Sequence, residues 1–276
     1  MIPKKIHFCW FSGDPYSEKV EECISSWRKA MPDYELVKWD MARIKDIDSV
    51  WLKECLAVRK WAFAADFVRL WAVFHEGGIY LDSDVMIYQS LDPFLSDKMF
   101  IGRENLYYPT LEDGIKVFLT SHCFGAEPGH PFLGLCLEYY QDRHFIGSSS
   151  ERIPNELRYN MLMMPYIQSS LAELFGYNPS ICADHKQVLS NGVTVYPTRY
   201  FNSWLTMNLP FQHYAQHLGI GGWREPEYWN SRSSGTVKYT LWYKIRWRLK
   251  FIVNYIFAMF GFVLVKISKK EDKDAL

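Results

Sequence analysis

Residues 59–84 read RKWAFAADFVRLWAVFHEGGIYLDSD, and this stretch decides the fold class. Its first part repeats apolar residues at steps of three and four, the spacing of one helix face; they are Trp61, Ala64, Ala65, Val68, Trp71 and Ala72. Gly77 and Gly78 end this helix, because glycine favours the backbone conformation that follows a helix C-terminus. Ile79–Leu81 then begins a strand that runs into Asp82-Ser83-Asp84. The stretch predicts a helix, a tight turn and a strand followed by two carboxylates.

The segments on both sides continue this alternation. We expect strands where short aromatic or β-branched runs are bounded by turn residues; these are Ile6–Phe11, Tyr34–Trp39, Met99–Gly102, Val117–Phe124 and Val193–Tyr196. We expect helices at residues 17–31, 131–141 and 160–175, and a polar, mobile loop at residues 146–157. A chain that alternates in this way is predicted to form an α/β fold with a mainly parallel central sheet.

Charge divides the 276-residue chain into two parts. The whole chain has 31 Lys and Arg against 31 Asp and Glu, but residues 1–237 have 22 against 28 and residues 238–276 have 9 against 3. We therefore predict a folded domain at 1–237 and a basic tail at 238–276. An apolar fraction of 49% excludes a disordered chain. The zero net charge gives no indication of a nucleic-acid partner, and we expect none.

The basic tail has the pattern of a membrane-associating segment. Its helical wheel places apolar residues on one face; they are Leu241, Trp242, Ile245, Leu249 and Ile252. The uncharged run Phe251–Val265 would form a helix of about 22 Å, shorter than the hydrocarbon core of about 30 Å. We expect an amphipathic helix with a shallow apolar insertion, peripheral or monotopic at the cytoplasmic face of a membrane. A full span, or helices packed on the domain, are the alternatives.

Aromatic and cysteine content adds two expectations. Aromatic residues make up 17% of the chain, which is typical of sugar-handling proteins and of membrane-interface proteins, and composition does not choose between them. The six cysteines form no C-x-x-C pair, so we expect reduced thiols in a cytosolic protein. Residues 1–7 have no apolar stretch of signal-peptide length, and we expect them to lead into the first strand.

Four charged residues of the central stretch form a candidate site. Asp82 and Asp84 are two residues apart, so within a regular strand they would point to one face and could offer oxygen ligands to Mg²⁺ or Mn²⁺. Asp66 and Arg69 share a helix face and could bind a polyol. Each pair alone is common, either by chance or as an exposed ion pair. Their combination is much more specific.

Three stretches together resemble glycosyltransferase family 32. They are IPKKIHFCWFSG at residues 2–13, AD-x-x-R at residues 65–69 and GGIYLDSD at residues 77–84. The family includes bacterial capsular-polysaccharide transferases, fungal α-mannosyltransferases and mannosyl inositol-phosphoceramide synthases. The resemblance is close over residues 1–90, weaker over residues 91–230 and absent from 238–276. It implies a GT-A fold, a nucleotide-binding α/β architecture.

The resemblance also implies roles for individual residues. Trp10 would pack against the nucleotide base, with Tyr80 beside the nucleotide. Asp66 and Arg69 would hold the hydroxyls of the donor sugar. Asp82 would contact the ribose or the metal ion, and Asp84 would bind the metal ion directly.

Later stretches match the family in part. Tyr214-Ala215-Gln216-His217, followed by Trp223, makes His217 the candidate third metal ligand and places Trp223 near the diphosphate. The family usually has a second histidine and a serine at the positions of Leu218 and Gly222. In the stretch from Thr120 to Pro131, we expect His130 to shape a turn and cap the next helix. His122 is expected either to face the sugar or to be a structural strand histidine.

Together these residues lead to a functional prediction. The resemblance implies a metal-dependent, retaining glycosyltransferase that moves a hexose from a nucleotide-diphosphate sugar to a lipid-linked glycan or polysaccharide acceptor. Asp66, Arg69 and Asp84 are its candidate catalytic residues, and retention would proceed by front-face substitution or by double displacement. The alternatives are a metal-dependent hydrolase of nucleotide-sugars or glycosides, and a non-catalytic, membrane-bound sugar-binding protein.

Overall fold

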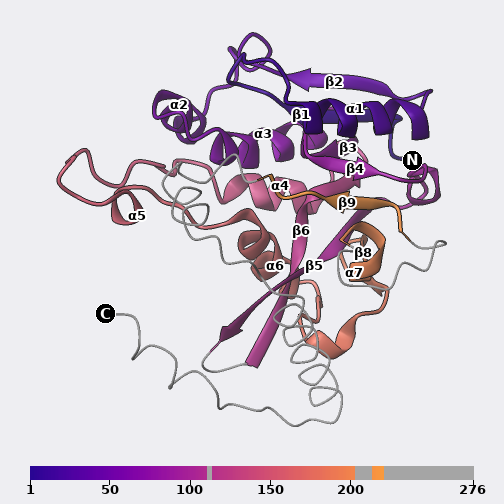
Figure 1. The fold of residues 1–276 in the computed structure, drawn as a ribbon. Coiled ribbons are helices and arrows are strands. Elements are labelled where there is room, and N and C mark those ends of the chain that lie inside the picture. Colours follow the sequence, from indigo (N-terminus) through magenta and orange to yellow (C-terminus); the bar gives the residue numbers. More distant parts are fainter. Residues whose placement is uncertain (111–113, 203–212, 221–276) are drawn as a thin grey trace, which may run out of the picture.

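Seven strands form the central sheet of the computed structural model, which describes residues 1–110, 114–202 and 213–220 (Figure 1). The strand order is β2-β1-β3-β6-β5-β8-β7. The strands are β1 (Lys5–Cys9), β2 (Glu35–Trp39), β3 (Gly78–Leu81), β5 (Met99–Thr110), β6 (Gly114–Ala126), β7 (Gln187–Val188) and β8 (Val193–Tyr196). Five of them run in one direction, and β6 and β7 run in the other. The prediction of an α/β fold with a mainly parallel sheet is confirmed.

Helices cover both faces of the sheet. They are α1 (Glu18–Ala30), α2 (Val50–Ala57), α3 (Trp61–Glu76), α4 (Pro131–Glu138), α5 (Asn155–Arg158), α6 (Met164–Glu173) and α7 (Thr198–Phe201), with short 3-10 turns at Asp92–Phe94 and Ile181–Ala183. Successive residues of a strand point to opposite faces, and Ile79 and Tyr80 accordingly belong to different apolar cores. The core around Tyr80 is covered by α2, α3, α4 and α6, and the core around Ile79 by α1. Helices α1, α2, α3, α4 and α6 thus each bury apolar residues against the sheet, whereas α5 buries none.

The turn between α3 and β3 depends on its two glycines. Gly77 has φ 64° and Gly78 has φ 108°, a region that other residues rarely adopt. A Cβ atom on Gly78 would lie 2.9 Å from the backbone carbonyl oxygen of Lys5 in the neighbouring strand β1. The glycines therefore let α3 turn sharply into β3 while β3 packs directly against β1.

Helix α2 and the short elements β7 and α7 were not predicted, and two further differences affect the region near the end of β3. β5 and β6 form an antiparallel hairpin much longer than the expected Met99–Gly102 and Val117–Phe124, because pairing continues through polar positions that lack an apolar pattern. A second, two-stranded sheet pairs β4 (Val85–Ile87) with β9 (Ala215–His217), and neither strand was predicted. This small sheet matters because it brings a C-terminal segment beside the end of β3.

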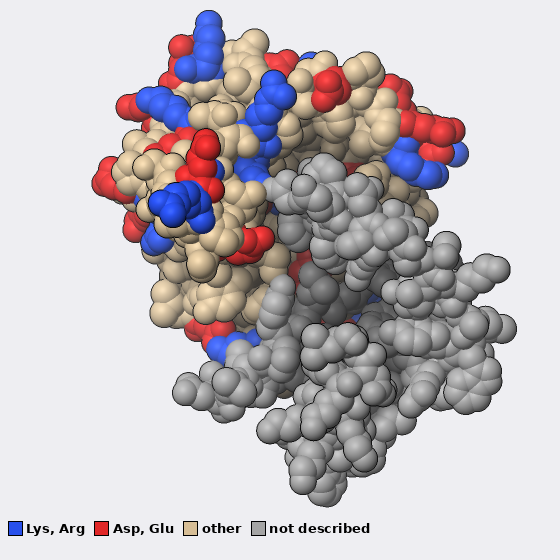
Figure 2. Space-filling view, turned by 60° about the vertical axis from the view of Figure 1, so that its left-hand side comes forward, with Lys and Arg blue, Asp and Glu red and all other residues tan. Residues whose placement is uncertain are grey.

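Other expectations are met or fall outside the described residues. His130 caps α4, since its Nδ1 accepts a hydrogen bond from the backbone N–H of Phe132 at 3.3 Å. The expected loop at 146–157 is a projecting segment that carries α5 (Figure 1). On the face shown in Figure 2, basic and acidic side chains are interspersed among uncharged residues. Among the described residues, no helix is long and apolar enough to cross a membrane. The tail at 238–276 lies outside them.

Candidate active site

Arg69 is a buried cation at the centre of the site. Its residue is only 4% exposed, and its guanidinium contacts two carboxylates: Nη2 lies 3.0 Å from Oδ1 of Asp66 and 3.2 Å from Oδ1 of Asp82. Nη1 donates to the carbonyl oxygen of Ser121 at 2.7 Å, and Nε donates to that of Ala65 at 3.2 Å. One side chain therefore connects α3, the end of β3 and β6.

Tyr80 contacts both Arg69 and Asp82. Its ring lies 4.7 Å from the Arg69 guanidinium, and its hydroxyl donates a hydrogen bond to Oδ1 of Asp82 at 2.8 Å. Burial, opposed by the charge of Arg69 and assisted by that of Asp82, raises the pKa of Tyr80 well above its ordinary value, so the phenol stays protonated and remains a donor. Tyr80 is 1% exposed, so it lies in the protein interior behind Arg69 and Asp82.

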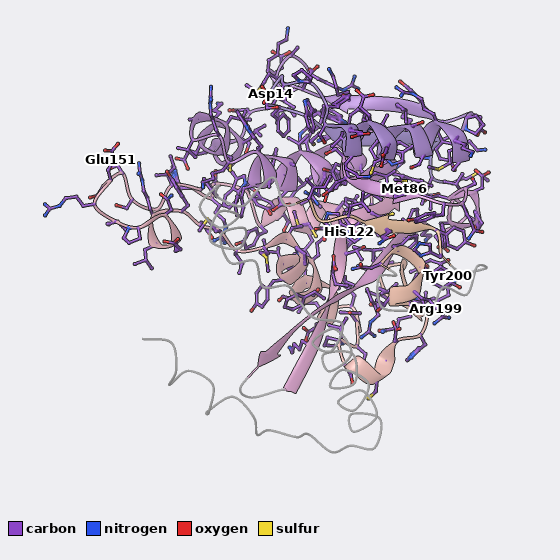
Figure 3. All side chains as sticks on the ribbon, in the orientation of Figure 1. Asp14, Met86, His122, Glu151, Arg199 and Tyr200 are labelled. Carbon is purple, nitrogen blue, oxygen red and sulfur yellow. The ribbon has the colours of Figure 1, made fainter. Side chains whose placement is uncertain are left out.

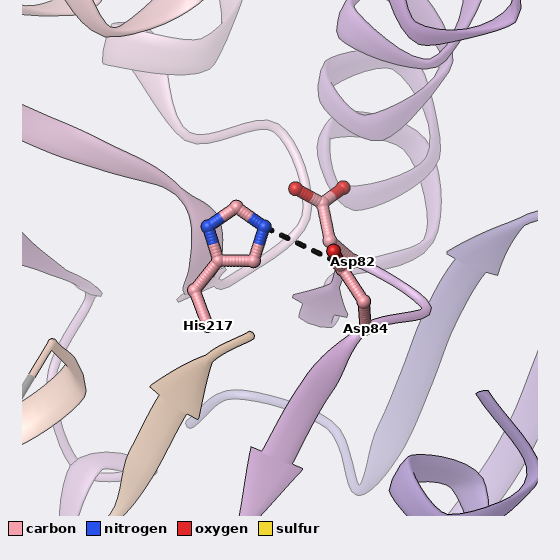
Figure 4. Close-up of side chains that lie close together, drawn as sticks. All are labelled: Asp82, Asp84 and His217. Carbon is pink, nitrogen blue, oxygen red and sulfur yellow. Dashed lines mark ion pairs between the residues drawn. The ribbon is translucent and has the colours of Figure 1, made fainter. Parts of the chain in front are cut away.

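The two carboxylates that follow β3 meet His217 of β9 (Figure 4). Asp82, Asp84 and His217 each offer a ligand atom, and these atoms lie within 4.8 Å of one another. The Nε2 atom of His217 lies 3.2 Å from Oδ1 of Asp84. The other oxygen of Asp84 accepts a hydrogen bond from the backbone N–H of Ile220 at 2.9 Å, which holds this carboxylate in place.

Electrostatics couple Asp84 to His217. Burial lowers the pKa of His217, but the hydrogen bond and charge of Asp84 outweigh it and raise the pKa to about 9. Burial likewise raises the pKa of Asp84, but the contact with His217 outweighs it and leaves the pKa below its ordinary value. At neutral pH the ligand-free pair is therefore an imidazolium and a carboxylate. Two carboxylates with one imidazole are a donor set that fits a divalent ion such as Mn²⁺.

A buried polar cluster lies behind His217 and was not predicted as a unit. The ring of His122 stacks on that of His217 with 4.6 Å between centroids, and Figure 3 shows His122 beside β9. Nδ1 of His122 lies 3.2 Å from Oε1 of Glu104, whose other oxygen accepts from Nδ2 of Asn202 at 2.5 Å. His122 was a candidate from the sequence. Glu104 and Asn202 had no sequence signal, because only the extended hairpin and α7 bring them together.

A pocket of about 530 Å³ follows the carboxyl ends of β1 and β2. Trp10 lines it, and its ring meets that of Tyr16 edge to face with 4.8 Å between centroids. Lys38 and Asp40, joined by a 3.1 Å ion pair, supply polar groups to the same pocket. Because β1 and β3 are parallel neighbours, this pocket and the Asp82 cluster lie at the same edge of the sheet, where open α/β sheets bind ligands. The remaining candidate, Trp223, lies outside the described residues.

Comparison with known proteins identifies this site. Residues 17–101 match the family described as "Glycosyltransferase sugar-binding region containing DXD motif". This part of the chain therefore resembles the DXD-containing sugar-binding region of glycosyltransferases. Asp66, Arg69, Asp82 and Asp84 all fall within the matched residues, whereas Trp10 and His217 lie outside them.

Two curated mannosyltransferases of a yeast are similar to about half of this chain. Inositol phosphoceramide mannosyltransferase 3 of Schizosaccharomyces pombe is 32% identical over 136 residues, which cover 48% of this chain and 35% of that protein. Inositol phosphoceramide mannosyltransferase 1 of the same yeast is 25% identical over 158 residues, covering 55% of this chain and 44% of that protein. The aligned region thus spans less than half the length of either relative.

Solved structures of glycosyltransferases overlap the chain in part. PaToxG glycosyltransferase aligns with a TM-score of 0.41 at 19% identity and covers 63% of this chain and 69% of its own. The galactosyltransferase LgtC, in complex with donor and acceptor sugar analogues, aligns with a TM-score of 0.31 at 14% identity, covering 50% of this chain and 65% of its own.

The buried carboxyl of Asp66 leads to a testable prediction for this candidate site. Burial raises the pKa of Asp66 to about 6 against the opposing charge of Arg69, so the folded protein holds a proton that the unfolded chain releases near pH 4. The free energy of unfolding of the wild type should therefore fall between about pH 4 and pH 6. Above pH 6, we expect Asp66→Asn to be more stable than the wild type by about 2–3 kcal/mol, a gain that disappears near pH 4.

Urea unfolding at several pH values measures this difference. Asp46→Asn is the matched control, because the Asp46 side chain is 87% exposed and its removal should leave the pH profile unchanged. If Asp66→Asn were less stable than the wild type at pH 7, the ionised carboxylate would stabilise the fold and the prediction would be wrong.

Proposed function

We propose that this chain transfers a hexose from a nucleotide-diphosphate sugar to a glycan or lipid-linked acceptor, with retention of the anomeric configuration and with a divalent ion. The observation that carries the proposal is that Asp82 belongs to two groups at once. It contacts Arg69, the cation paired with Asp66, and it forms the candidate metal site with Asp84 and His217. The groups proposed to bind the sugar and those proposed to bind the diphosphate therefore meet at the Asp82 carboxylate. Transfer of the sugar away from the diphosphate requires both parts of the donor to be held side by side.

The metal site would consist of Asp82, Asp84 and His217. A bound Mn²⁺ or Mg²⁺ would neutralise the diphosphate leaving group. Asp84 is held for this task by the backbone N–H of Ile220, and His217 by its place on β9, so the three ligands are positioned before the ion arrives. His217 must lose its proton to become a ligand, because only the neutral imidazole has a free lone pair.

Asp66 and Arg69 would position the donor sugar. The Asp66 side chain retains 13% of its exposure, so it can accept hydrogen bonds from sugar hydroxyls. Arg69 is held by two backbone carbonyls as well as by carboxylates, and its positive charge is therefore fixed beside the leaving group without rearrangement. Such preorganised charge is worth most in a water-excluded site.

The pocket at Trp10 would receive the nucleobase. Trp10 is only partly buried, and with Tyr16 it offers aromatic surface to a flat ring beside the polar Lys38 and Asp40. The volume of about 530 Å³ falls in the range of small-molecule sites. Trp223 is proposed to contact the diphosphate. We assign a GT-A type fold to the domain on the same grounds, since nucleotide pocket and DXD carboxylates follow neighbouring parallel strands.

Retention would proceed by front-face substitution. The acceptor oxygen forms its bond to the anomeric carbon on the face from which the diphosphate oxygen departs, and the acceptor proton passes to that departing oxygen. Double displacement would need a carboxylate nucleophile, and Asp66 is engaged by Arg69 at 3.0 Å. In this proposal the protein supplies position and charge rather than a strong base.

The two yeast relatives are inositol phosphoceramide mannosyltransferases, which favours a mannosyl donor and an inositol phosphoceramide-like acceptor. Capsular polysaccharide is the alternative acceptor class. A hydrolase of nucleotide-sugars is the competing activity, and a non-catalytic sugar-binding protein is the competing class. The aromatic pocket at Trp10 counts against a hydrolase of simple glycosides, which needs no nucleobase platform, whereas a nucleotide-sugar hydrolase is distinguished by its indifference to acceptor.

Heat stabilisation by GDP-mannose, UDP-glucose, UDP-galactose and UDP-N-acetylglucosamine, with and without Mn²⁺, tests the proposal. We expect one donor to stabilise the chain in a Mn²⁺-dependent way and to be consumed faster when acceptor is present. Asp84→Asn should lower transfer at least about 100-fold, since it removes a charged metal ligand, whereas Asp46→Asn should retain full activity. Full activity in Asp84→Asn, or release of free sugar that no acceptor accelerates, would contradict metal-dependent transfer.

We also propose that the tail at 238–276 attaches the domain to the cytoplasmic face of a membrane. The support is its excess of basic residues and its apolar run, which suit anionic lipid. Binding of the full chain to vesicles of phosphatidylserine and phosphatidylcholine should weaken with salt, and should fall severalfold in the double variant Arg246→Glu, Lys250→Glu. Equal binding of that variant at low salt would rule out electrostatic attachment through the tail.

A further inference from the structure

His7 is a fully buried histidine whose two ring nitrogens have partners of opposite kind. It lies in β1, between β2 and β3 of the central sheet (Figure 1), with 0% exposure. Its Nδ1 accepts a hydrogen bond from the indole Nε1–H of Trp39 at 3.0 Å, and its Nε2 donates to the carbonyl oxygen of Gly77 at 2.8 Å. An indole N–H only donates and a carbonyl only accepts, so these partners select the neutral tautomer with its proton on Nε2.

The surroundings of His7 maintain that neutral form. Burial is the largest cause that lowers the pKa of His7, and the hydrogen bond to Gly77 and the charge of Glu76 oppose it. The charges of Lys5 and Arg43 act in the same direction as burial, and the pKa is below its ordinary value. At neutral pH Nδ1 therefore remains an acceptor for the indole.

The Trp39 ring that His7 binds supports one wall of the aromatic pocket. The Arg43 guanidinium lies over that ring, 4.5 Å from its centroid. The backbone N–H of Arg43 donates to Oδ1 of Asp40 at 3.2 Å, which closes the turn that follows β2. Residues 40–42 of this turn line the pocket. The position of the indole therefore bears on the position of this wall.

Trp39 is also joined to the opposite wall through its backbone. Its carbonyl oxygen accepts a hydrogen bond from the backbone N–H of Trp10 at 2.9 Å, and Trp10 is the aromatic residue proposed to receive the base. Lys38, the residue before Trp39, lines the pocket as well. Trp39 itself is 2% exposed, so it lies in the interior next to the pocket and connects both of its walls.

We propose that His7 is a positioning residue for the nucleotide: its Nδ1 fixes the Trp39 indole, and the indole holds the turn at residues 40–43 in the geometry that receives the base. This inference rests on the proposed function, because it takes the ligand of the pocket to be the nucleotide of the donor. The competing role is structural, in which the bond from Nε2 to Gly77 stabilises the α3–β3 turn and the pocket is independent of His7. The two roles use different nitrogens of one ring.

Two amide variants separate the two nitrogens. His7→Asn places an amide near the position of Nδ1, where it can accept from Trp39, whereas His7→Gln places one near Nε2, where it can donate to Gly77. Affinities of the purified full chain for GDP and UDP are measured with saturating Mn²⁺, and affinity for Mn²⁺ is measured alone. For the nucleotide that binds the wild type more tightly, we expect a loss of about tenfold in His7→Gln and of at most about threefold in His7→Asn. Affinity for Mn²⁺ should stay within about twofold in both.

The indole N–H signal of Trp39 gives a second measurement that needs no ligand. A proton–nitrogen NMR spectrum of the full chain, in which Trp39→Phe identifies the signal, shows whether the indole N–H is hydrogen-bonded. We expect the signal to stay near its wild-type position in His7→Asn and to move upfield in His7→Gln. His185→Gln is the control variant, because His185 is an exposed histidine in the segment before β7, and it should change neither the signal nor the affinities.

Three results would overturn the inference. Nucleotide affinity that is unchanged in His7→Gln, or weakened equally in both variants, would leave His7 with the structural role at Gly77. A parallel loss of affinity for Mn²⁺ would indicate general damage to the sheet. An indole signal that is the same in His7→Gln and the wild type would show that Nδ1 does not fix Trp39. If neither GDP nor UDP binds the wild type, the proposed function itself fails, and the indole signal still reports the contact between His7 and Trp39 separately.

Discussion

The ion pairs of buried Arg69 are the interaction on which the site depends. A single guanidinium, 4% exposed, is shared by Asp66 from its own helix and Asp82 from the end of β3, and it is fixed by the Ser121 carbonyl of β6. Removing Arg69 would leave two buried carboxylates without the cation they share, which costs about 3–5 kcal/mol. The α3–β3 turn, in which a Cβ on Gly78 would strike Lys5 and one on Gly77 would strike Pro128, makes this convergence possible.

The pairing of β4 with β9 is a second constraint on the site, because it brings a late segment of the chain beside Asp84. The short pairing of β4 with β9 sets Val85 opposite His217, and the backbone N–H groups of Leu218 and Ile220 bind Asp84. The carboxylate that follows β3 is thus oriented by a segment more than a hundred residues away. In the ligand-free protein its charge is balanced by protonated His217, and a metal ion would replace that proton. Asp82 then belongs both to the ion pairs of Arg69 and to the candidate metal site.

The local sequence predicted what depends on local spacing. Helical periodicity placed Asp66 and Arg69 on one face, and the strand ending at Leu81 placed Asp82 and Asp84 at the carboxyl edge; family resemblance added His217, which the structure brings to them. Long-range pairing decided the rest. Neither β4 nor β9 has the length or pattern of a strand, and Glu104, Asn202 and Gln168 are polar residues at positions that only tertiary packing buries. These strands and polar residues were not predicted because their positions depend on contacts between distant parts of the chain.

Calorimetric titration of the purified chain with Mn²⁺ between pH 6.5 and pH 9 tests the central claim, that Asp82, Asp84 and His217 form one divalent metal site. Because His217 has a pKa raised to about 9 and must give up its proton, apparent affinity should rise about tenfold per pH unit up to about pH 8, with close to one proton released to the buffer, and should level off near pH 9. Asp84→Asn should weaken binding and flatten the dependence. Affinity that is independent of pH, or equal in Asp84→Asn, would contradict the account.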